Sequence, residues 1–250
     1  MIFLIINPSD LERYQLTYNT IKKAAGTEFA GTAYLRDYNY AKAITWFKKS
    51  TNKKKLQINT NPYFDLLYDQ EEPLASEAKF VTTKVAFAEE MQKQMLLTVT
   101  DKANTAKHFY QLANGLYNIT YYGHAWQLVQ YNRSGSDRYS IPAGATSFQK
   151  EYYSCYSALG YFKKAMEASA DNNFKARCLF MMAKCSQNQI PNPSYNSHGN
   201  NLNAGEKTYW PKFIFNKYFP ALIKKYSKTP FFIEAYNSYS YLSDFVKHKN

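Results

Sequence analysis

The stretch that decides the fold is AGTAYLRDYNYAKAITWFKKS, residues 30–50. Small and large side chains recur at helical spacing on both sides of a polar turn at Asp37–Asn39. Residues three or four apart share one face of a helix, so the small side chains of one helix can meet the rings of the other. The pattern predicts two antiparallel helices that pack closely through Gly31, Tyr34, Tyr40, Ala43, Phe47 and Ser50.

Helical periodicity continues along the chain, whereas the alternation typical of strands is scarce. We therefore predict an all-α protein, with residues 1–250 forming a single helical domain. Long polar loops are expected near 52–74, 133–147 and 188–207, where Pro, Gly and Asn gather. Between them we expect helices over about 10–33, 40–50, 75–98, 105–119, 123–134, 148–170, 173–187, 210–227 and 230–248.

The spacing in residues 30–50 resembles the tetratricopeptide repeat, a motif of two helices with small residues at the close crossings and large ones beside them. Looser matches follow at Phe109, Leu112, Ala113, Leu116, Tyr122, Ala125 and Val129, then at Ala158, Phe162 and Ala165, and weakly at Phe219 and Leu222. The resemblance implies an irregular α-α superhelix with repeat-like units near 24–57, 106–139, 155–187 and 212–247. A generic helical bundle is the alternative, because any bundle needs small residues at its crossings.

A second resemblance lies in the tract LANGLYNITYYGHAWQLVQYNRSGSD, residues 112–137. This tract looks like segments of uncharacterised helical-repeat proteins from the Bacteroidota. That likeness implies no activity.

The charge and the aromatic content of the chain indicate which classes of partner it can bind. The net charge is +12, and the second half of the chain carries most of it, with 16 basic against 7 acidic residues. A basic surface favours acidic partners. The positive charge comes mostly from Lys rather than Arg, so we do not expect nucleic-acid binding. The 24 tyrosines suit both helix seams and binding surfaces.

Motifs for catalysis are missing from the sequence. The four histidines lie apart without an HExxH pattern, no Gly-rich phosphate loop occurs, and the three cysteines include no CxxC pair. We therefore expect no enzyme activity, no metal site and no cofactor. Cys155, Cys178 and Cys185 are expected to be buried free thiols.

The first residues, MIFLIINPSDLERY, begin with an apolar run of six. The run is too short for a secretory signal, and no stretch approaches the length of a membrane span. Because apolar side chains at the start of the chain are unfavourable in water, we expect either that the natural chain extends upstream or that this run packs onto the first helices. A complete chain would be cytoplasmic, and a fragment of an exported precursor would belong to the periplasm or outer membrane.

The repeat resemblance also implies where a partner binds. In that family, exposed positions of each first helix line a concave face. Position by position, these are Glu28, Thr32 and Arg36, then Tyr110, Asn114, Tyr117 and Asn118, then Arg177 and Lys184. Tyr110 stands where carboxylate-clamping members have Lys, and Glu28 adds an opposing charge, so we reject that clamp.

Two functions remain open at this point. The first is a non-catalytic scaffold that binds a protein or peptide, with Arg36, Tyr110, Asn114, Tyr117, Asn118, Arg177 and Lys184 as contacts. The alternative is a glycan-binding protein of an outer-membrane uptake system, because some such proteins are built on similar repeats. Trp126, Trp210, Tyr195 and the Asn-rich loop 188–203 would then bind sugar.

Overall fold

The structure is a computed structural model, and it describes residues 26–51, 56–65, 67–69, 81–133, 141, 144–190 and 204–249. The prediction of an all-α fold is confirmed for this part of the chain. The helices span 26–36, α2 Tyr40–Lys48, α3 Lys84–Thr100, α4 Thr105–Asn118, α5 Ser147–Ser154, α6 Tyr156–Glu167, α7 Asn172–Asn188, α8 Ala204–Ile214, α9 Phe219–Tyr226, α10 Pro230–Ser238 and α11 Ser240–Lys249. Short 3₁₀ turns η2 (Lys102–Asn104) and η3 (Trp126–Leu128) and the antiparallel pair β1 (Gln57–Ile58) and β2 (Thr82–Thr83) complete the set. Among the described helices, none has the length and apolar character needed to cross a bilayer.

The hairpin predicted from residues 30–50 is present. The helix at 26–36 ends at the turn 37–39, and Asn39 caps α2 by accepting a hydrogen bond from the Lys42 N–H. A Cβ added at Gly31 would lie within 3.0 Å of three ring atoms of Phe47. Ala43 and Phe47 are fully buried. The small residue therefore permits the close crossing that the sequence pattern predicts.

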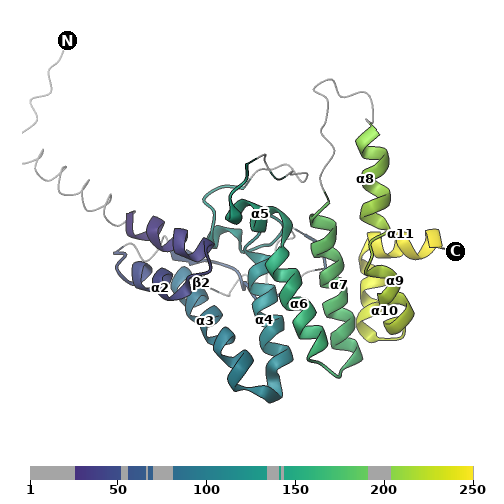
Figure 1. Cartoon of the computed structure of the whole chain (residues 1–250), viewed down its shortest axis with the longest axis horizontal. Coiled ribbons are helices and arrows are strands. Elements are labelled where there is room, and N and C mark those ends of the chain that lie inside the picture. Colours follow the sequence, from purple (N-terminus) through teal and green to yellow (C-terminus); the bar gives the residue numbers. More distant parts are fainter. Residues whose placement is uncertain are drawn as a thin grey trace, which may run out of the picture.

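Successive helices pack against one another along the chain (Figure 1). α2 contacts α3, α3 contacts α4, and α6 packs against both α4 and α7. α9 and α10 then pack against α7. On either side of α6, α4 and α7 both also contact one further segment of the chain.

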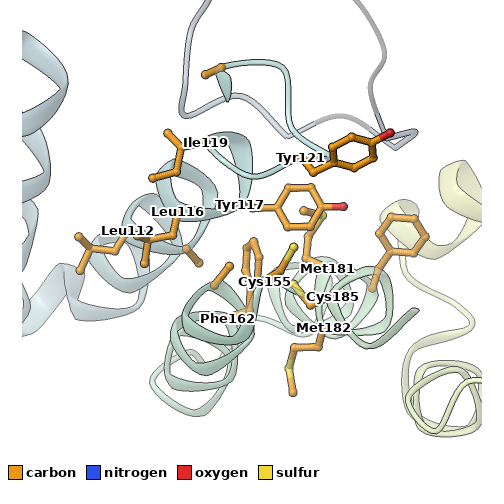
Figure 2. Close-up of a cluster of buried hydrophobic side chains, with 14 of the residues drawn as sticks. Leu112, Leu116, Tyr117, Ile119, Tyr121, Cys155, Phe162, Met181, Met182 and Cys185 are labelled. Atoms are coloured by element: carbon orange, nitrogen blue, oxygen red, sulfur yellow. The ribbon is translucent and has the colours of Figure 1, made fainter. Parts of the chain in front are cut away.

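The core runs continuously through these seams. In Figure 2, Tyr117 of α4 lies beside Met181 and Cys185 of α7, whereas Leu112 and Leu116 lie on the opposite side of α4. Cys155 and Cys185 lie in the same cluster, and all three cysteines are buried free thiols, as predicted. Burial raises the pKa of the Cys178 and Cys185 thiols well above its usual range.

The helix predicted over 123–134 is wrong. Residues 119–125 turn back on the end of α4, where the Ala125 N–H donates to the Asn118 carbonyl. Gly123 lies so close to the Asn118 backbone that a side chain there would clash. Ala125 is buried as expected, but it is not on a helix. The unit near 106–139 thus lacks a second helix, and α6 packs against α4 instead.

Other boundaries also differ from the prediction. Cys155 adopts a left-handed conformation (φ 52°) that separates α5 from α6. α3 begins at Lys84, after a Thr83 cap, rather than near 75. The predicted helix 210–227 is divided into α8 and α9, where Pro220 lies in the first turn of α9. Tyr239 is extended and separates α10 from α11.

Candidate functional site

A short stretch of the chain lies across α4 and α7, on side chains that the sequence predicts as partner contacts. We call residues 61–65 and 67–69 the resident segment. Six predicted contacts form a hydrogen bond or ion pair with it. These six define the α4–α7 face: Tyr110, Asn114, Tyr117, Asn118, Arg177 and Lys184.

The face binds two aspartates of the resident segment. At the Asp65 site, the Tyr110 hydroxyl donates to Asp65 Oδ2 at 2.6 Å, and Arg177 Nη1 lies 3.0 Å from the same oxygen. At the Asp69 site, the Tyr117 hydroxyl donates to Asp69 Oδ1, and Lys184 Nζ lies 2.9 Å from that oxygen. Each site thus combines one tyrosine of α4 with one cation of α7.

The two sites repeat at a fixed helical spacing. Tyr110 and Tyr117 are seven residues apart, as are Arg177 and Lys184. Seven residues are about two turns, so each pair shares a helix face and is about 10 Å apart along the axis. The arrangement therefore suits two carboxylates at about that separation.

Beside the tyrosines of these two sites, asparagines of α4 bind main-chain carbonyls of the resident segment. Asn118 Nδ2 donates to the Pro62 and Phe64 carbonyls at 3.0 and 2.7 Å, and Asn114 Nδ2 donates to the Tyr63 carbonyl at 3.1 Å. Gly115 leaves room beside Tyr63, because an added Cβ would lie 3.1 Å from its ring. These contacts recognise a peptide backbone whatever its side chains are.

One acceptor of the face is unsatisfied. Asn114 Oδ1 is buried and has no hydrogen-bond partner among the described residues. The nearby donors of the resident segment are directed elsewhere: Tyr63 N–H donates to Asn61 Oδ1 and Phe64 N–H to Asn61 O, while Pro62 has no N–H. The resident segment therefore leaves a buried polar atom unpaired, which is a free-energy cost of about 1–3 kcal/mol.

Electrostatics fix the protonation states of the face. Burial and the neighbouring carboxylates raise the pKa of Tyr110 and Tyr117 well above the usual value, so both remain donors at neutral pH. Burial is the largest single effect on the Arg177 pKa and lowers it, but the charge and hydrogen bond of Asp65 together with Tyr110 and Glu234 outweigh burial, so the net shift is upward. Lys184 is only 1% exposed, so its charge is almost fully removed from water.

The sequence-based description of these positions as exposed is wrong. Asn114, Tyr117, Asn118 and Lys184 are all buried in the folded chain. Arg36 is not part of the α4–α7 face, since its guanidinium donates to Val129 O at 2.7 Å and to Gln130 Oε1 at 2.8 Å. Glu28 and Thr32 are also buried, in a separate network. Sequence reasoning missed Asp65, Asp69 and Asn188, whose Nδ2 contacts Asp69 and Tyr117.

That separate network forms the floor of a cavity. The buried Lys84 ammonium contacts Glu28 and Thr32, and the Tyr131 hydroxyl donates to Glu28 Oε2 at 2.9 Å. Burial lowers the pKa of Lys84 against the opposing effect of Glu28. The cavity has a volume of about 270 Å³ and is lined by Glu28, Phe29, Gln57, Ile58, Lys84, Gln127, Gln130 and Tyr131.

Of the residues predicted for glycan binding, the structure describes the surroundings of Trp126 and Trp210. Trp126 faces the Arg133 guanidinium at 5.3 Å from the ring centroid, and Trp210 packs among Tyr209, Phe213 and Tyr241. No ring contact joins the two tryptophans within the described chain. Tyr195 and most of the loop 188–203 lie outside the described residues.

Comparison with known proteins identified no related protein. No protein-family model matches this chain, and neither a curated protein nor a solved structure does. No cluster of three or more metal-ligating side chains occurs among the described residues. The fold and the face thus define an all-α protein in which two helices bind an acidic stretch of polypeptide.

Proposed function

We propose that this chain is a non-catalytic, tetratricopeptide-like helical scaffold that binds a protein or peptide partner through the α4–α7 face. One observation carries the proposal: the face already binds polypeptide, with Asn side chains on main-chain carbonyls and Tyr–cation pairs on carboxylates. Charge-assisted hydrogen bonds of this kind are among the stronger polar contacts in proteins. The partner is therefore an acidic segment, in keeping with the chain's net charge of +12.

A random-peptide display library panned against the full chain tests this function. We expect enrichment of peptides rich in Asp and Glu, and we expect Arg177→Ala to abolish their capture. Arg177 is the appropriate position because its side chain is 36% exposed, so its removal need not unfold the core. Lys163→Ala is the matched control, since Lys163 lies on α6 in an exposed pair with Glu167. Failure to enrich acidic peptides, or enrichment that Arg177→Ala leaves unchanged, contradicts the proposal.

The cavity beside Lys84 favours a second candidate, capture of a glycan. Phe29 and Tyr131 are about half exposed there, and their rings meet edge to face at 5.1 Å between centroids. Exposed rings can cover the apolar face of a sugar, while the Gln57 and Gln127 amides at the rim can donate to and accept from hydroxyls. A glycan array decides this candidate: binding that Tyr131→Ala abolishes supports it, and silence removes it.

A further inference from the structure

We infer that the resident segment is an exchangeable internal occupant of the α4–α7 face, and that the external partner is an acidic peptide that displaces it. The inference rests on the proposed function and specifies the partner's chemistry. The partner presents two carboxylates that reach the Asp65 and Asp69 sites together, about 10 Å apart. It also presents a main-chain N–H group to Asn114.

Charge distribution is the first reason. The cations of the face come from α7, while both carboxylates come from the resident segment. Removing the segment would take both carboxylates from the face and leave Arg177 and Lys184 in place on α7. The empty face therefore favours another carboxylate, because hydrogen bonds between ionised groups are among the stronger polar contacts in proteins.

The imperfect fit of the resident segment is the second reason. Asn114 has its amide nitrogen bound to the Tyr63 carbonyl while its Oδ1 is unpaired. In an extended peptide the N–H and C=O groups of one residue point to the same side. Here the Tyr63 N–H is instead bound by the Asn61 side chain. A partner without that internal bond can pair with both atoms of Asn114, so it gains a contact that the resident segment lacks.

Two features oppose this exchange: Tyr63 and Leu67 of the segment pack against the core, and the segment is covalently tethered to its own site. A segment joined to its own site competes at an effective concentration that reaches the millimolar range. If the segment leaves the face in about one molecule in a hundred, the apparent Kd of an outside peptide rises about 100-fold. Wild-type protein should therefore bind a competing peptide weakly, and weakening the resident segment should expose the site.

The experiment uses the full chain and the fluorescently labelled peptide NPYFDLLYD, which is the sequence of residues 61–69. The variant Asp65→Asn/Asp69→Asn keeps the shape of the resident segment but removes both charges. We expect the variant to bind the peptide at least about tenfold more tightly than wild type does, measured by fluorescence anisotropy. The control peptide NPYFNLLYN should bind neither protein, because it lacks both carboxylates.

Three results would overturn the inference. A folded variant that does not bind the peptide shows that the resident segment is a fixed part of the core. Equal binding by wild type and variant, or by both peptides, shows that the peptide binds elsewhere. If the double variant does not fold, Asp65→Asn alone serves, because its pair with Arg177 is partly exposed; the peptide must then raise its unfolding temperature, and no shift refutes the exchange. Arg177-dependent capture from the library alongside such a failure would show that acidic partners bind at the exposed edge of the face, at Arg177, without displacing the segment.

Discussion

The close crossing at Gly31 gives a quantitative test of the packing. Gly31 and Gly160 both lie in helices, so alanine gains about 0.8–1 kcal/mol of helix propensity at either position. A Cβ at Gly31 would lie within 3.0 Å of ring atoms of the fully buried Phe47, whereas a Cβ at Gly160 would meet nothing within 4 Å. Overpacking a buried site costs about 1–3 kcal/mol, so Gly31→Ala should be less stable than Gly160→Ala by that amount.

Urea unfolding followed by circular dichroism measures this difference. We expect Gly160→Ala to raise the midpoint and Gly31→Ala to lower it relative to that variant, with unchanged slopes. The propensity gain cancels between the two variants, so the difference reports the contact with Phe47 alone. If Gly31→Ala matches or exceeds Gly160→Ala in stability, the small residue is not what permits the crossing, and the reasoning from residues 30–50 fails.

Three further predictions concern buried polar groups and thiols. Glu28→Ala should destabilise the fold by about 3–5 kcal/mol, because it leaves the Lys84 ammonium without its carboxylate. The double variant Glu28→Ala/Lys84→Met should recover most of that stability, as measured by urea unfolding. Equal loss of stability in both variants would contradict the pairing. Burial raises the pKa of Tyr131 and Tyr152 to about 12, so the folded chain keeps protons that the unfolded chain loses near 10.0. Stability is therefore complete below pH 10.0 and falls as the pH rises above it, and loss of helix should be accompanied by a further step in tyrosinate absorbance beyond that of the exposed tyrosines. The three buried cysteines should react with a thiol reagent only on unfolding, and rapid labelling of the native chain would disagree with their burial.

Much of the fold follows from local sequence because helix faces are local features. Gly31, Ala43 and Phe47 meet through spacings of three or four residues and one short turn, all visible within residues 30–50. The absent helix at 123–134 has a different cause. Gly123 and Ala125 turn back on Asn118, and this contact depends on tertiary packing rather than on helical periodicity. The left-handed conformation of Cys155 could not be predicted from the sequence either, because cysteine has no preference for that conformation.

The candidate site combines positions on helices, which local sequence can indicate, with a segment far away in the chain, which it cannot. The repeat-like spacing selected the helix positions that make up the α4–α7 face, and their role as partner contacts stays a prediction. The internal segment that contacts these residues could not be predicted, because Asp65 lies 45 residues before Tyr110 and 112 residues before Arg177. No periodic signal links a loop to a helix at such distances. The available clue was charge alone, since Asp65 and Asp69 are two acidic residues four apart in a basic chain.

The chemistry of the face bears on whether the resident segment is permanent. A stretch of chain that never leaves its site is best bound by apolar contacts, because replacing buried ion pairs with well-packed hydrophobic side chains is often neutral or stabilising. Here Tyr63 and Leu67 of the segment do pack against the core, but the helices also bind two carboxylates and three main-chain carbonyls, and the Asn114 amide oxygen is unpaired. Polar contacts of this kind add specificity, and when a segment leaves, water can satisfy the groups that it bound. These polar contacts of the α4–α7 face are therefore the observation on which our proposal of an exchangeable acidic segment rests.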